Sequence, residues 1–340
     1  MITVLITGCA KHSMELVRCL KNNEDNILVR VVSTNMNEHA ILRTGVDAVY
    51  IMKPITDKNY IHDLIEVCKK EKVDVIIPYI TAELPLLARK KKLFEENGIK
   101  VSIADKEAID VLNDKIIMHE KYGKFMPMEI EVHSSKELHK ALDKFKEKGI
   151  ESVCCKINSK CGGTGFAILD EEKAYDISLF NRCKVNRYVG ISELEKIADR
   201  YATEIILQEY IQGTDYSVCV LANKGRVTEI CGYAGYEMEF GSVVDGEVLK
   251  NDNAYKISKY IAENEKLDGN ACFDFMLMDN GDVKLLECNP RVNASIGFVW
   301  KAGANLMWLR CKALLGMKCK ENHDIKYGLR MMKYYEAAYF

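Results

Sequence analysis

The sequence predicts an α/β protein that begins with a small domain built on a doubly wound parallel sheet. In the first hundred residues, short apolar runs alternate with amphipathic stretches of helical spacing, which is the pattern of βαβ units. Further along, the stretch 272–291 has two apolar runs flanking Asn280 and Gly281, which is typical of a β-hairpin. A chain of 340 residues is long enough for two or three domains.

The overall composition excludes several classes of function. The net charge is −2 with 29% charged residues, which favours neither a nucleic-acid-binding surface nor an acidic tail. The 13 cysteines lack zinc-ligand spacing, so we expect them to be small buried residues in a reducing cytoplasm. The N-terminus has no basic segment and no apolar run reaches 18 residues, which predicts neither a signal peptide nor a membrane partner.

The N-terminal domain follows from its alternating elements. Helical spacing is found over residues 13–20, 60–70 and 84–97, and strand-like runs over 2–7, 29–33, 73–78 and 100–103. Gly8 follows the first strand, but no further glycines complete a dinucleotide-binding fingerprint. We therefore do not expect nicotinamide or flavin binding here.

A helix and a glycine-rich hairpin are predicted in the middle of the chain. Residues 134–148 have an apolar stripe, with Ser135 as the expected N-cap and Gly149 as the stop. The strand 152–157 carries Lys156 and runs into a glycine-rich loop, followed by a returning strand. Such a loop lets backbone N–H groups approach phosphate oxygens, although many such turns only connect strands. It is not a Walker A loop, because no helix or Gly-Lys-Ser/Thr follows.

A strand over 205–211, broken at Gly213, precedes a second strand over 216–222. Backbone groups at Glu209, Tyr210 and Ile211 could pair with the edge of adenine, and Asp215 could accept hydrogen bonds from ribose hydroxyls. The alternative is that Glu209 and Asp215 are ordinary turn carboxylates. A strand region over 228–239 and a helix over 252–264 then lead to the hairpin.

The hairpin is predicted to bring two carboxylates together. If Asn280 and Gly281 form a two-residue type I′ loop, counting back along both strands sets Asp274 opposite Glu287. Asn289 then points to the same face as Glu287.

The neighbouring residues on both hairpin faces are apolar, so two facing carboxylates would repel each other and resist desolvation. A divalent cation removes both difficulties, and an all-oxygen set of Asp, Glu and Asn suits Mg²⁺ and not zinc. The alternative is an edge hairpin whose acids face solvent.

The FDF strand, the turn and the ECNPR strand resemble the metal-binding hairpin of ATP-grasp ligases. The branch most similar contains carbamoyl-phosphate synthase large subunits and related amino-acid ligases. The resemblance implies that Asp274, Glu287 and Asn289 hold Mg²⁺, with Mn²⁺ as a possible substitute. It also implies that Arg291 faces a phosphate or acyl phosphate as a catalytic residue.

The same resemblance implies a set of ATP-binding residues. Lys115 and Lys156 match two phosphate-contacting lysines, the second also catalytic, although Ile157 stands where proline is frequent. Asp215 is one methylene shorter than the usual Glu. The implied set of nucleotide-binding residues comprises Lys115, Lys156, Gly162, Gly163, Gly165, Glu209, Tyr210, Ile211 and Asp215.

Residues 76–88 resemble the substrate-facing segment of the pre-ATP-grasp domain, which implies that Thr81 and Glu83 face the non-nucleotide substrate. The alternative for Glu83 is that its carboxylate lies at a helix N-terminus because the helix dipole favours a negative charge there. The resemblance divides the chain into a pre-ATP-grasp domain (1–110), an ATP-grasp N-terminal subdomain (111–190) and a C-terminal subdomain (191–340).

The implied activity is ATP-dependent ligation of a small carboxylate to an amine or a thiol, through an acyl phosphate, with release of ADP and phosphate. Amino acids or related metabolites are the expected substrates, and a homodimer is suggested by analogy alone. The alternatives are a bicarbonate-activating enzyme like carbamoyl-phosphate synthase or a carboxylase, and an ATP-binding protein without turnover.

Overall fold

The computed structural model describes residues 1–9, 13–37, 45–157, 165–176, 187–201, 205–239 and 241–334. The chain divides into two compact units. Unit 1 comprises Met1–Asn113, Thr214–Phe275 and Glu287–Phe340, and unit 2 comprises Asp114–Gly213 and Met276–Leu286. The division into three domains at residues 110 and 190 stays a prediction.

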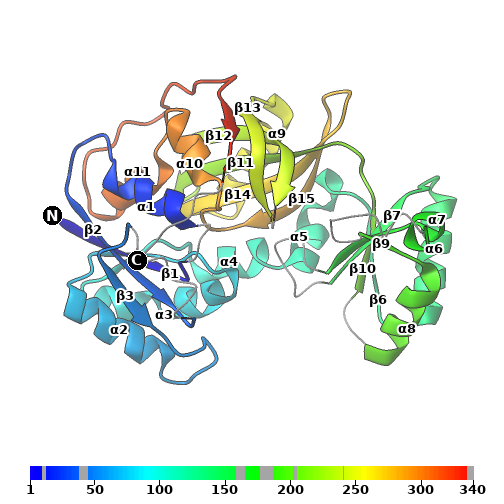
Figure 1. The fold of residues 1–340 in the computed structure, drawn as a ribbon, viewed down its shortest axis with the longest axis horizontal. Coiled ribbons are helices and arrows are strands. Elements are labelled where there is room, and N and C mark those ends of the chain that lie inside the picture. The colour runs from blue at the N-terminus through cyan, green and yellow to red at the C-terminus, as the bar shows by residue number, and fades with distance from the viewer. Residues whose placement is uncertain are drawn as a thin grey trace. The chain divides into compact units, whose positions relative to one another are not determined.

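Unit 1 contains the predicted doubly wound parallel sheet. Its strand order is β3-β2-β1-β4-β5, and every neighbouring pair is parallel. Helix α1 lies on one face, and α2 and α3 lie on the other (Figure 1). The elements are β1 (Ile2–Thr7), α1 (Met14–Lys21), β2 (Val29–Asn35), β3 (Ala48–Ile51), α2 (Tyr60–Glu71), β4 (Val75–Ile77), α3 (Leu84–Glu96), β5 (Lys100–Val101) and α4 (Lys106–Leu112).

A six-stranded sheet of order β15-β14-β11-β12-β13-β16 carries the predicted metal hairpin. The apolar alternation predicts most of this sheet, but β13 was not expected. The elements are β11 (Thr214–Asn223), β12 (Arg226–Glu239), β13 (Ser242–Val248), α9 (Asp252–Asn264), β14 (Gly269–Leu277), β15 (Val283–Asn289), α10 (Ile296–Lys301), α11 (Leu306–Leu314) and β16 (Arg330–Met332).

The N-terminal sheet and the C-terminal helices of unit 1 share one core. Buried residues of β1 and α1 pack in the same cluster as buried residues of α10 and α11, including the fully buried Trp308. Polar contacts fix the packing: Trp308 Nε1 donates to Asp25 Oδ2 at 2.6 Å, and Asn305 Nδ2 donates to the Cys19 carbonyl at 2.7 Å. The parallel sheet is therefore held against the segment that follows the hairpin.

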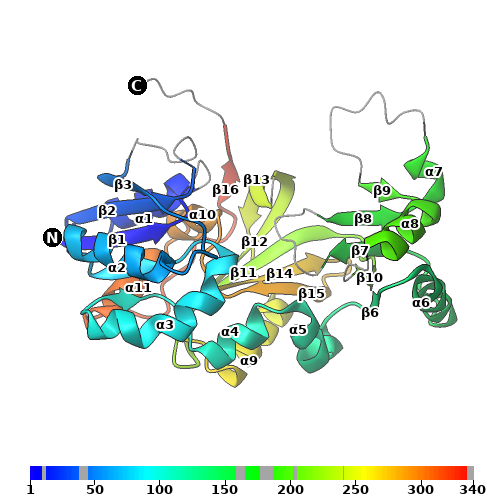
Figure 2. The ribbon, with the colours of Figure 1, turned by 90° about the horizontal axis from the view of Figure 1, so that it is seen from below.

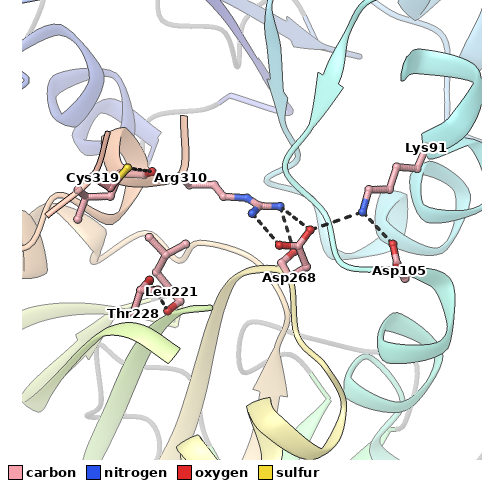
Figure 3. Close-up of polar contacts among 8 residues, drawn as sticks. Lys91, Asp105, Leu221, Thr228, Asp268, Arg310 and Cys319 are labelled. Carbon is pink, nitrogen blue, oxygen red and sulfur yellow. Dashed lines mark hydrogen bonds and ion pairs between the residues drawn. The ribbon is translucent and has the colours of Figure 1, made fainter. Parts of the chain in front are cut away.

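A partly buried ion network fixes the segment that begins β14 (Figure 3). Arg310, 2% exposed, donates to Asp268 Oδ1 at 3.0 Å, and Lys91 Nζ lies 3.8 Å from Asp268 Oδ2 and 2.8 Å from Asp105 Oδ1. Burial would raise the pKa of Asp268, but the hydrogen bonds and charge of Arg310 hold that pKa below its usual value. Because Asp268 precedes β14, this network anchors the strand that carries Asp274.

Unit 2 is a five-stranded sheet of order β6-β10-β7-β8-β9, covered by α6 and α8 (Figure 2). The N-cap of α6 is Ser134, whose Oγ accepts from the Glu137 N–H at 3.3 Å, so the expectation of Ser135 was wrong by one residue. The elements are α5 (Lys115–Tyr122), β6 (Glu129–Val132), α6 (Ser135–Glu147), β7 (Val153–Ile157), β8 (Phe166–Leu169), α7 (Glu171–Ala174), β9 (Tyr188–Val189), α8 (Ile191–Tyr201) and β10 (Ile205–Glu209).

The cysteines in the described ranges are all unpaired thiols, and all but Cys319 are buried, as predicted. Over the same ranges, no helix combines the length and the apolar character that crossing a membrane requires.

Candidate functional site

Three side chains of the hairpin meet in unit 1. Asn289 Nδ2 donates to Asp274 Oδ2 at 2.9 Å and to Glu287 Oε1 at 3.1 Å. One amide nitrogen can reach both carboxylates only if they lie on the same side of the hairpin. The structure therefore brings together the three residues that the sequence predicts as metal ligands.

The turn of this hairpin differs from the predicted type I′ loop. Gly281 N donates to the Met278 carbonyl and Met278 N donates to the Asp282 carbonyl, both at 2.9 Å, so the loop has three residues. Type I′ needs positive φ at both central positions, but Gly281 has a φ of +85° and Asn280 is not left-handed. Asn280 Oδ1 instead accepts from the Asp282 N–H at 3.0 Å, which stabilises the longer turn. The predicted register is therefore wrong at the tip.

Asp274 is a desolvated carboxylate. Burial raises the pKa of Asp274 to about 6, and the charge of the neighbouring Glu287 adds to the increase. Ser217 Oγ and Cys272 Sγ donate to Asp274 Oδ1 at 2.6 and 3.4 Å, and these contacts oppose the increase. Ser217 was not predicted; its signal was a hydroxyl within the apolar run of β11.

The donor set of this site fits a hard divalent cation. Two carboxylates and an amide can supply oxygen ligands, which suits Mg²⁺. In this structure the N–H groups of Asn289 bridge Asp274 and Glu287. The described residues contain no group of three His, Cys, Asp or Glu side chains arranged for a metal, and the predicted set consists of two carboxylates and an amide.

Arg291 packs directly against the triad. Its Nη2 donates to Asn289 Oδ1 at 3.3 Å, its Nη1 to the Val292 carbonyl at 2.8 Å, and its Nε to Thr81 Oγ1 at 3.0 Å. The guanidinium carbon lies 5.8 Å from the centre of the Tyr79 ring. Thr81, predicted to face substrate, thus contacts the arginine predicted to face the acyl phosphate.

Glu83 lies at the N-terminus of α3 but does not cap it. Its side chain is 2% exposed, Tyr60 donates to its Oε1 at 2.8 Å, and its Oε2 has no hydrogen-bond partner in the described structure. Burial raises the pKa of Glu83, and hydrogen bonds from Thr7 and Tyr60 partly offset that increase. The placement fits neither a solvated helix carboxylate nor an exposed substrate ligand.

The two predicted phosphate-binding lysines lie in unit 2. Lys156 is on β7, paired with Ile206, and Lys115 opens α5 behind its N-cap Asp114. Both lysines act on Glu129, a buried carboxylate of β6: burial raises the pKa of Glu129, and the charges of Lys156 and Lys115 oppose the increase. Both lysines therefore lie near enough for their charges to act on Glu129.

Glu129 was missed by sequence reasoning, as was its partner Gln208, which donates to Glu129 Oε1. Gln208 is 2% exposed in the middle of an apolar strand, and a polar residue inside such a run was the available signal. Nothing in the sequence places it opposite Glu129, because β6 and β10 pair across almost eighty residues.

The backbone of the predicted adenine-binding segment is partly occupied. Glu209 N donates to the Met128 carbonyl and Tyr210 N to the Ser152 carbonyl, both at 2.9 Å, so these two N–H groups are used within the protein. That backbone groups of this segment pair with adenine stays a prediction. Of the other predicted residues, Asp215 lies on β11 in unit 1.

Of the three glycines in the predicted phosphate loop, the structure describes Gly165. Gly165 has a φ of +72° and its carbonyl accepts from Ile157 N at 3.1 Å, which closes the base of the hairpin. Gly162 and Gly163 lie outside the described residues.

Two family models match the sequence. Residues 4–102 match the N-terminal domain of PylC-like proteins, and residues 202–337 match the family described as ATP-grasp in the biosynthetic pathway with Ter operon. No curated protein matches the sequence significantly.

Solved structures share the fold over nearly the whole chain. N5-carboxyaminoimidazole synthetase from Staphylococcus aureus, complexed with ADP, is 15% identical with a TM-score of 0.68, covering 96% of this chain and 80% of that one. Biotin carboxylase from Campylobacter jejuni is 16% identical with a TM-score of 0.65, covering 95% and 73%. L-amino acid ligase from Bacillus licheniformis is 15% identical with a TM-score of 0.61, covering 93% and 74%.

Proposed function

Because residues 202–337 match an ATP-grasp family model, we propose that this chain is an ATP-dependent ligase that joins a small carboxylate to an amine or a thiol, with Mg²⁺ as a second cofactor. The carboxylate attacks the terminal phosphorus of ATP, forming an acyl phosphate and releasing ADP. The amine or thiol then attacks the acyl carbon and displaces inorganic phosphate. The expected substrates are amino acids or related small metabolites.

The observation that carries this proposal is the network in unit 1. Asn289 holds Asp274 and Glu287 together on one side and contacts Arg291 on the other. An acyl-phosphate mechanism needs a cation site next to a group that binds an anion, and this network offers candidate residues for both. Magnesium bound there would neutralise charge on the phosphates of ATP.

The lysines of unit 2 fit a second role in the same chemistry. The charges of Lys156 and Lys115 act on the buried carboxylate Glu129. Ammonium groups can stabilise charge on a transferring phosphoryl group. The N–H of Ile211 could donate to a ring nitrogen of adenine.

The test is product analysis with a substrate panel. The protein is incubated with Mg-ATP and pairs of amino acids, other small acids, amines and thiols, and nucleotides are separated by chromatography. We expect ADP and phosphate, formed only when an acid and a nucleophile are both present. Hydroxylamine should trap the acyl phosphate as a hydroxamate. AMP and pyrophosphate as main products would rule out this mechanism.

The variant Lys156→Met removes one of the two predicted phosphate-binding lysines, and we expect its kcat to decrease by about 100-fold or more. Lys146→Met, an exposed change on α6, is the control. Turnover with bicarbonate as the only acid would instead support the bicarbonate-activating alternative.

A further inference from the structure

The two ends of the Asn289 amide have opposite partners. Nδ2 donates to Asp274 and Glu287, and Oδ1 accepts from Arg291 Nη2 at 3.3 Å. This orientation satisfies every group. The reverse would set Oδ1 against two carboxylate oxygens and Nδ2 against a guanidinium N–H, so that acceptors face acceptors and donors face donors.

A cation changes which orientation is favourable. Mg²⁺ and Mn²⁺ take oxygen ligands from an amide and never its nitrogen. Asn289 can therefore serve beside Asp274 and Glu287 only by presenting Oδ1 to their side, which turns Nδ2 toward Arg291. Arginine has N–H donors and no acceptor, so the Nη2 contact must end.

The rest of the Arg291 guanidinium is held by groups outside the triad. Nε donates to Thr81 Oγ1 and Nη1 donates to the Val292 carbonyl, with the Tyr79 ring beside the plane. These contacts do not depend on the orientation of the Asn289 amide. Loss of the Nη2 contact therefore frees one end of the guanidinium without releasing the whole side chain.

We propose that Asn289 couples occupation of the cation site to the availability of Arg291. Without the cation, the amide holds Nη2; with it, Nη2 is free to bind an anionic oxygen. This inference rests on the proposed function, which makes the triad a magnesium site and supplies an acyl phosphate for Arg291. By linkage, an anion bound at Arg291 should in turn strengthen cation binding.

The experiment measures the reactivity of Arg291 toward phenylglyoxal, by mass spectrometry of the peptide that contains it, with and without saturating Mg²⁺. We expect modification to be about fivefold faster with Mg²⁺, the factor for one lost hydrogen bond. Arg310, which is buried and paired with Asp268, and the exposed Arg330 are internal references that Mg²⁺ should not change.

Two variants separate the coupling from a general effect of the cation. In Asn289→Asp the carboxylate can accept from Arg291 and also ligate the cation, so Arg291 should stay slow in both conditions. In Asn289→Ala nothing accepts from Nη2, so Arg291 should react fast in both conditions. Mn²⁺ binding, followed by electron paramagnetic resonance, reports the cation site independently.

An Mg²⁺-dependent increase in the wild type that both variants lack supports the coupling. A wild type that binds Mn²⁺ without any change at Arg291, or an equal increase in either variant, overturns the coupling and leaves the proposed function standing. A wild type that binds no Mn²⁺ contradicts the magnesium site itself, and the coupling falls with it.

Discussion

At the scale of single residues, buried carboxylates of unit 1 differ in the partners that compensate them. Asp268 has a guanidinium, and its pKa is lowered despite burial. Asp274 has only a hydroxyl, a thiol and an amide as hydrogen-bond donors within the described structure, and burial raises its pKa. Asp274 lies beside a second carboxylate and has no cationic side chain as a partner among the described residues, so it is suited to a bound cation. The charge of Asp268 is already neutralised by Arg310.

Glu83 gives a prediction about pH. Burial raises its pKa in the folded protein above its ordinary value, so the folded state binds the proton more tightly than the unfolded chain. Stability from this group is present at low pH and is lost as pH rises through the raised pKa. Glu83→Gln should therefore increase the free energy of unfolding at pH 7.5, and the gain should vanish below about pH 4.

The measurement is urea denaturation of both proteins at several pH values. Glu95→Gln, an exposed change on α3, should show no pH-dependent difference. A Glu83→Gln protein that is less stable than wild type at pH 7.5 would mean that the ionised carboxylate stabilises the fold.

At the scale of elements, local sequence signals predict the bounds of a helix correctly where its capping residue and its apolar periodicity agree. The helix α9 has the predicted bounds because Asn251 caps it and its apolar spacing is regular. The prediction of the hairpin turn was wrong because an Asn-Gly pair fits both a two-residue and a three-residue loop. The hydrogen bond between the Asn280 side chain and the Asp282 N–H favours the three-residue loop. The N-cap of α6 was predicted at Ser135, one residue too late, because Ser134 and Ser135 offer the same capping hydroxyl.

The α6 cap is directly testable. Ser134→Ala removes the acceptor of the Glu137 N–H and should destabilise the protein by about 1 kcal/mol. Ser135→Ala lies inside the first turn and should change stability by only a few tenths of a kcal/mol. Equal effects of the two changes in denaturant melts would mean that Ser134 does not cap the helix.

At the scale of the whole molecule, sequence motifs indicate candidate site residues but not the residues that contact them from distant parts of the chain. The triad comes from one hairpin, so its members could be predicted together. Arg291 and Thr81 are 210 positions apart, and no local pattern reports their contact. The same holds for Glu129 of β6, which contacts Gln208 of β10 through strand pairing and is affected by the charges of Lys156 and Lys115.

We propose that Asp274, Glu287 and Asn289 form a magnesium site that serves ATP-dependent ligation. Mn²⁺ titration followed by electron paramagnetic resonance tests it most directly, in wild type, Glu287→Gln and the exposed control Glu263→Gln on α9. We expect Glu287→Gln to weaken Mn²⁺ binding at least about tenfold, because the cation loses a charged ligand, while the control binds as wild type. A Glu287→Gln protein with wild-type Mn²⁺ affinity and normal ADP formation would contradict the claim.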